Sequence, residues 1–175
     1  MHVARTSNSA ERKTNWLFPA LLLLVSTGFF VPTARAADDK TSIQILSVKA
    51  TKANKDLPDE LKSLGSTLRD KTGCTGFKVE RTKSDSAKAG ESVSTPLVGG
   101  YSAEVTAVES SKGRVTLQVK ISEKTTGKDD KGKEKTTTKT VLNSKITINA
   151  GSAQIFTFGY PGSSDEKLVV VVSAK

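Results

Sequence analysis

The sequence predicts an α+β fold with one N-terminal strand, one helix, and then a mostly antiparallel β-meander or sandwich of about seven strands. Two observations lead to this prediction. Leu57, Leu61, Leu64 and Leu68 recur at the spacing of one helix face, whereas from Phe77 onward apolar residues alternate with polar ones. Glycines or prolines separate nearly all of the alternating segments, as expected for short strands joined by turns.

Residues 1–36 have the three parts of a secretory signal peptide, so they are expected to be cleaved. A polar stretch with Arg5 and Arg12 precedes the apolar run LFPALLLLVSTGFFVP, and TARA supplies a small-residue cleavage site ending at Ala36. The alternative is an uncleaved anchor, but this run is shorter than the roughly 20 residues of a bilayer span. We therefore expect an exported protein, periplasmic or extracellular, with a single domain at residues 37–175 and no transmembrane segment after cleavage.

The elements of that domain are expected in a definite order. The first strand is predicted in SIQILSVKA, and the helix that follows should begin at the N-cap Asp56 and end at Gly73 in the left-handed conformation. The run Leu168 to Val172 has no polar alternation, which predicts a central strand covered on both faces. The strands after the helix are expected in GFKVERT, YSAEVTAV, RVTLQVKIS, TTTKTVL, SKITINA, AQIFTFG and KLVVVVSA.

Aromatic residues near the C-terminus raise the question of a core or a recognition surface. Phe156 and Phe158 alternate within AQIFTFG, a pattern that favours the buried side of a strand. Tyr160 lies at the Pro-Gly turn, where the pattern is compatible with burial and with exposure.

Several kinds of chemistry are excluded once residues 1–36 are removed, because the remaining chain contains no histidine, tryptophan or methionine. Ser-His and Cys-His nucleophiles and imidazole metal sites are therefore excluded. The sequence predicts no catalytic residue, no cofactor and no metal site. Cys74, the single cysteine, cannot form a disulfide within the chain. Burial is the favoured interpretation, and pairing between chains is the alternative.

The charge of residues 37–175 is +6, from 23 Lys and Arg against 17 Asp and Glu. Such an excess favours anionic surfaces. Residues 123–140, EKTTGKDDKGKEKTTTKT, contain no apolar residue, which predicts a polar, lysine-rich, solvated hairpin loop, with partner contact as the second interpretation. The candidate partner contacts are Tyr160, Lys128, Lys131, Lys133 and Lys135.

These observations favour an exported, non-catalytic binding or structural domain of the envelope or the extracellular space. Its partner would be an envelope protein or an anionic surface polymer. One alternative is a subunit of an envelope or export assembly joined by strand addition. Another is a hydrolase or lyase that uses carboxylates and lysines, with Glu104, Glu109 and Glu123 as candidates. Intracellular nucleic acid is not expected as a partner, because the protein is exported and IFTFGY contains no Arg or Lys.

Several segments together resemble a group of small exported bacterial proteins of planctomycete and myxobacterial type. They are the signal peptide, IQILSVKA, the helix opening DLPDEL, the strand GRVTLQVKI and the closing AGSAQIFTFGYPGSSDEKLVVVVSA. The resemblance extends over most of residues 37–175 and rests on apolar spacing and glycines. It implies no catalytic or binding residue.

Overall fold

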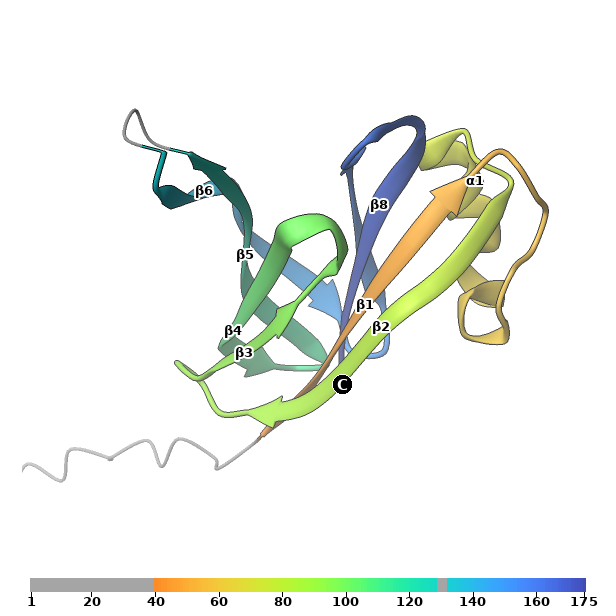
Figure 1. Ribbon diagram of the computed structural model, residues 1–175. Coiled ribbons are helices and arrows are strands. Elements are labelled where there is room, and N and C mark those ends of the chain that lie inside the picture. Colours follow the sequence, from red (N-terminus) through yellow and green to blue (C-terminus); the bar gives the residue numbers. More distant parts are fainter. Residues whose placement is uncertain (1–39, 129–131) are drawn as a thin grey trace, which may run out of the picture. The chain divides into compact units, whose positions relative to one another are not determined.

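The computed structural model describes residues 40–128 and 132–175, which form two four-stranded antiparallel sheets and one helical region (Figure 1). Sheet A has the strand order β2-β1-β8-β7, and sheet B has the order β3-β4-β5-β6. The predicted signal peptide lies outside the described residues. The strands are β1 Thr41–Thr51, β2 Gly76–Ala87, β3 Ser92–Pro96, β4 Tyr101–Ser111, β5 Arg114–Lys128, β6 Glu134–Asn149, β7 Ala153–Tyr160 and β8 Ser163–Ala174. The helical elements are the 3-10 helix η1 Asp59–Leu64, the α-helix α1 Gly65–Thr72 and the short 3-10 turn η2 Val98–Gly100.

The prediction of a mostly antiparallel β fold with one helix is confirmed, but its details differ from the structure. The N-terminal strand β1 is not set apart, because it pairs with β2 on one side and with β8 on the other. The strand β3 had no counterpart in the prediction. The two strands expected at residues 136–142 and 144–150 form the single strand β6. The strand contains a β-bulge but does not end there. Leu142 pairs with Ile121 and Thr140 pairs with Ser122, so Val141 is an extra residue in β6.

The main core lies between the two sheets. Strand β1 contributes Ile43 and Ile45, and β8 contributes Val170 and Val172, which face the alternating apolar residues of β4 and β5. Inward-facing residues alternate with outward-facing polar ones along β4 and β5, as in other two-layer β-structures. The buried residues of this core are Ile43, Ile45, Ala87, Val93, Leu97, Ala103, Val105, Ala107, Val115, Leu117, Val119, Ile121, Ile148, Leu168, Val170, Val172 and Ala174.

The opposite face of sheet A is covered by the helical region. Val169 and Val171 of β8 share a second core with Leu61 of η1, Leu68 of α1 and Phe77 of β2. The valine run of β8 is therefore covered on both faces, and the predicted central strand is confirmed.

The prediction is confirmed for the end of the helical region and wrong for its beginning. Gly73 ends α1 with φ of 67°, in the left-handed conformation that was predicted. The predicted N-cap at Asp56 is wrong, because the helical region begins after Pro58 without a side-chain cap. The carbonyl of Asp56 instead accepts a hydrogen bond of 2.8 Å from the N–H of Phe77, which ties the segment before η1 to the start of β2.

Cys74 lies directly after the helix and is 1% exposed, so the interpretation of a buried thiol is confirmed. Its N–H donates a 3.1 Å hydrogen bond to the Thr72 hydroxyl, which in turn donates to the carbonyl of Leu68 at 2.6 Å. These bonds satisfy polar groups at the end of the helix where the chain turns toward β2.

The prediction of a loop at residues 123–140 is wrong for residues 123–128 and 134–140, which belong to strands. Strands β5 and β6 stay paired as far as Lys128 and Glu134, so these residues form a two-stranded extension of sheet B (Figure 1). We call residues 123–128 and 132–140 the arm. Threonine favours extended strands, and Thr125 and Thr126 pair with Thr137 and Thr136 across the arm. The arm has regular structure, and it lacks apolar residues because it covers no core.

Phe156 and Phe158 face the core between the sheets, as predicted, but they are half-buried rather than buried. The reason is that β7 is an edge strand of sheet A, so a neighbouring strand covers only one of its sides. Tyr160 is also half-buried and packs against the same core.

Candidate functional site

One end of the sandwich brings together η2 with the start of β4, the turn between β7 and β8, and the base of the arm. The ring centroids of Tyr101 and Phe158 lie 5.9 Å apart, with 33° between the ring planes. Tyr101 begins β4 in sheet B and Phe158 belongs to β7 in sheet A, so this contact joins the two sheets. We call the following residues the aromatic end: Lys49, Tyr101, Glu123, Phe158, Tyr160 and Glu166.

Two glycines let η2 approach both neighbours closely. Gly99 and Gly100 have φ of 70° and 80°, a conformation that favours glycine. A Cβ atom on Gly99 would lie 2.5 Å from Cγ of Pro161 in the β7–β8 turn. A Cβ atom on Gly100 would lie 2.8 Å from the carbonyl oxygen of Lys124 at the base of the arm. Through η2, the turn that carries Tyr160 is therefore connected to the arm.

Lys49 connects β1 with the hairpin of β7 and β8. Its Nζ lies 2.8 Å from Oε1 of Glu166 and 4.8 Å from the ring centroid of Tyr160. The pKa of Lys49 is raised, and the hydrogen bond with Glu166 is the largest cause. Burial, the next largest, opposes this change, and the charge of Glu166 raises the pKa further. Tyr160, a predicted partner contact, therefore has an ammonium group over its ring and lies beside a fixed ion pair.

Tyr101 and Glu123 lie opposite each other in the β4–β5 ladder. Burial is the main cause that raises the pKa of the Tyr101 hydroxyl, and the charge of Glu123 and a hydrogen bond with it raise it further. Glu123 is half-buried at the first position of the arm. The carboxylate therefore acts as an acceptor for the phenol, which holds the base of the arm next to β4.

The arm presents lysines on both of its faces. Residues that pair across two strands share a face, so the register places Lys124 and Lys128 on one face and Lys135 and Lys139 on the other. All four side chains belong to exposed residues. Of the predicted contacts, Lys128, Lys133 and Lys135 are exposed in the arm, and Lys131 lies outside the described residues.

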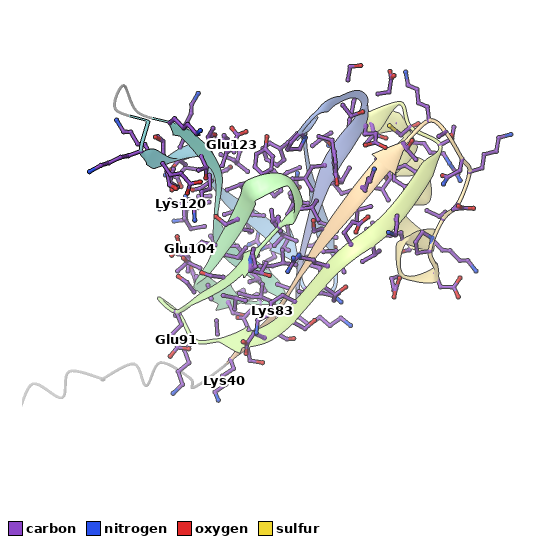
Figure 2. All side chains as sticks on the ribbon, in the orientation of Figure 1. Lys40, Lys83, Glu91, Glu104, Lys120 and Glu123 are labelled. Carbon is purple, nitrogen blue, oxygen red and sulfur yellow. The ribbon has the colours of Figure 1, made fainter. Side chains whose placement is uncertain are left out.

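The three candidate carboxylates of the hydrolase hypothesis do not converge in the structure. Glu104 points away from the core and lies 3.7 Å from Lys120, its cross-strand neighbour (Figure 2). Glu123 shares the inward face of β5 with Ile121, further along the strand toward the arm (Figure 2). Glu109 lines a shallow depression of about 270 Å³ together with Arg114 and Thr147. The three carboxylates therefore lie in different surroundings on sheet B.

Sequence reasoning missed Lys49, Tyr101 and Glu166. Lys49 lies in β1 and Glu166 in β8, the first and last of the described strands, and the pairing of these two strands brings them together. The glycine pair before Tyr101 was a usable signal, since adjacent glycines between two strands indicate a close backbone approach. No comparable local signal pointed to the ion pair.

No protein-family model matches the sequence, and a comparison with curated proteins finds no similar chain. Within residues 40–128 and 132–175, no helix is long and apolar enough to cross a membrane.

Proposed function

We propose that this protein is an exported, non-catalytic domain that binds another component of the cell envelope or of the extracellular space through its arm and the adjoining Tyr160. The observation that carries the proposal is the arm itself. It is a regular ribbon with exposed side chains on both faces, it covers no core, and its base is held by contacts of the aromatic end.

Contacts at its base keep the arm in order. A two-stranded ribbon without an apolar face is marginally stable on its own, so its order depends on the contacts at its base. The interface between η2 and Lys124, and the Tyr101–Glu123 pair, supply these contacts. The arm adds nothing to the core, yet its base is held in place. Such a ribbon is suited to contact with a partner.

The chemistry of the arm favours an acidic partner. Residues 123–140 contain six lysines against four carboxylates, so the excess positive charge is small. Glu134 lies opposite Lys128 and Glu123 lies opposite Lys139, which leaves Lys124 and Lys135 without a carboxylate directly across the ribbon. We therefore propose that several exposed lysines attract the acidic partner. This attraction weakens as salt screens the charges. An envelope protein with an acidic surface is the proposed partner, and an anionic surface polymer is the alternative that the test separates.

The proposal includes export by the signal peptide at residues 1–36, so the mature protein would begin at Ala37. Mass spectrometry of protein purified from the envelope or the medium tests this part. A mature species that retains the apolar run of residues 17–32 would contradict it.

The binding test uses two sets of lysine substitutions in the exported protein. The arm variant carries Lys→Gln changes at Lys124, Lys128, Lys135 and Lys139. The matched control carries the same changes at four exposed lysines outside the arm, Lys40, Lys52, Lys55 and Lys71. Binding to envelope fractions is measured by co-sedimentation at rising salt concentrations.

We expect the affinity of the arm variant to fall by about tenfold or more and that of the control to stay close to wild type. Protease treatment of the envelope fraction should abolish binding if the partner is a protein and leave it intact if the partner is a polymer. Equal binding by both variants would show that the arm lysines do not form the contact surface.

A further inference from the structure

The sandwich is closed on one side and open on the other. Eight partly buried hydrophobic residues pack against the core between the sheets, and six of them lie on the edge strands β6 and β7. These six are Val141, Leu142, Ile146, Phe156, Phe158 and Tyr160. We call them the open seam.

The opposite pair of edge strands shows the contrast. Strand β2 contributes Ala87 to the same core and β3 contributes Val93, and these residues are only 2% and 5% exposed. None of the partly buried residues that pack against this core comes from the described residues of β2 or β3. The core is therefore well covered at β2 and β3, while at β6 and β7 large apolar side chains keep part of their surface in water.

Strand β6 has a free side along this open seam. It is the last strand of sheet B and pairs only with β5 among the described strands, although it is the longest of them. The bulge at Val141 divides it into the arm and an inner part, residues 142–149, which pairs with residues 114–121. Along the inner part, Ile146 and Leu142 face the core, and Lys145 faces outward.

The charge of β6 indicates which kind of strand its free edge would attract. Its charged residues are Lys135, Lys139 and Lys145 with the single carboxylate Glu134. Lysines on an edge strand oppose pairing with a like-charged strand, so a second copy of β6 would bring cationic strands together. An acidic strand would instead gain attraction from the same lysines.

We propose that the inner part of β6 accepts an extended, acidic segment of a partner protein as an added strand of sheet B. Alternate apolar side chains of that segment cover Leu142 and Ile146 at the open seam, and its carboxylates lie near Lys145 and the lysines of the arm. Backbone hydrogen bonds along the edge hold the segment, and the side chains select it. This inference rests on the proposed function, because it names how the protein partner binds beside the arm.

The test uses the exported protein and a fluorescent peptide of about eight residues in which valine alternates with glutamate, a length typical of a strand. Alternate backbone amides of a strand point to opposite edges. Two N-methylated forms of the peptide are therefore made, each with methyl groups on one of the two alternate sets of amides. One of these forms cannot donate hydrogen bonds to β6. Polyglutamate of the same length keeps the charge and removes the apolar alternation. Affinity is measured by fluorescence anisotropy, and the binding site by amide hydrogen exchange.

We expect the alternating peptide to bind about tenfold more tightly than one N-methylated form and than polyglutamate. Its binding should slow hydrogen exchange in residues 142–149 and leave β2 unchanged. Lys145→Glu should weaken binding several-fold, whereas Lys71→Glu on α1, the matched control, should not. Equal binding of the alternating peptide and both N-methylated forms would overturn the inference, and so would protection confined to another strand.

The outcome is separable from that of the proposed function. If the arm variant loses envelope binding while N-methylation of the peptide changes nothing, the arm is the contact surface and strand addition is wrong. If the arm variant binds envelope as wild type does, the proposed function itself fails.

Discussion

The rings of Tyr101 and Phe158 lie 5.9 Å apart between centroids, so the two sheets contact each other through aromatic side chains at the end that carries the arm. Tyr101 directly follows Gly100, whose backbone approaches the carbonyl oxygen of Lys124. A change that separates the rings should therefore affect the stability of the sandwich and the position of the arm.

The contact between the rings should be measurable as a coupling energy. We expect Tyr101→Leu and Phe158→Leu to show a coupling of about 0.5–1.5 kcal/mol in a double-mutant cycle, the range of aromatic pairs beyond their area burial. Urea unfolding of both single variants and the double variant is the measurement. Phe156→Leu, two residues away on the same face of β7, should couple more weakly with Tyr101→Leu. Additive effects for Tyr101 and Phe158 would mean that the contact contributes nothing specific.

Stability should decline at alkaline pH in a way that depends on Tyr101. Burial and Glu123 raise the pKa of this hydroxyl in the folded protein above the ordinary value near 10. The contribution of the protonated Tyr101 hydroxyl to stability is therefore fully present below about pH 10. It is lost as the pH rises through the higher pKa of the folded state. The free energy of unfolding should fall more steeply above about pH 10 in wild type than in Tyr101→Phe. Parallel pH profiles of the two proteins would refute this account.

The hydroxyl of Ser47 offers a test of the core between the sheets. Ser47 is 1% exposed, its Oγ has no hydrogen-bond partner among the described residues, and it pairs with the core residue Val170. Because an unsatisfied buried hydroxyl is costly, Ser47→Ala should leave stability unchanged or raise it by up to about 1 kcal/mol. A loss of more than about 1 kcal/mol on thermal unfolding would show that the hydroxyl is bonded in solution, for example to a buried water.

The leucines of the helical region should differ in their contribution. Leu68 is fully buried against sheet A, whereas Leu64 is half-buried. Leu68→Ala should cost about 2–5 kcal/mol of unfolding free energy, and Leu64→Ala distinctly less. Equilibrium urea unfolding of both variants is the measurement. Equal losses would mean that the helix packs on the sheet through a wider face than the structure shows.

Much of the fold could be predicted because local patterns agree with tertiary burial. The alternation in RVTLQVKIS gives the inward face of β5, and the unbroken valines of β8 indicate a strand covered on both sides. Gly73 could be placed because the left-handed end of a helix has a strong residue preference.

The arm and the aromatic end could be predicted less well. Residues 123–140 have the composition of a loop, and only the cross-strand pairing within the arm shows that its described residues form a ribbon. The ion pair of Lys49 and Glu166 depends on the pairing of β1 with β8, which no short stretch of sequence encodes. The half-burial of Phe156 and Phe158 depends on β7 being an edge strand, which is a property of the strand order.

The most direct measurement replaces the arm and examines folding and binding together. Lys124 pairs with Thr138, so residues 125–137 can be replaced by Asn-Gly, a sequence suited to a two-residue hairpin turn. Because the described residues among those removed, 125–128 and 132–137, cover no core, the free energy of unfolding in urea should change by less than about 0.5 kcal/mol. The shortened protein should nevertheless lose its salt-dependent binding to envelope fractions. A shortened protein that is equally stable and still binds envelope as wild type does would contradict the claim that the arm is the contact surface.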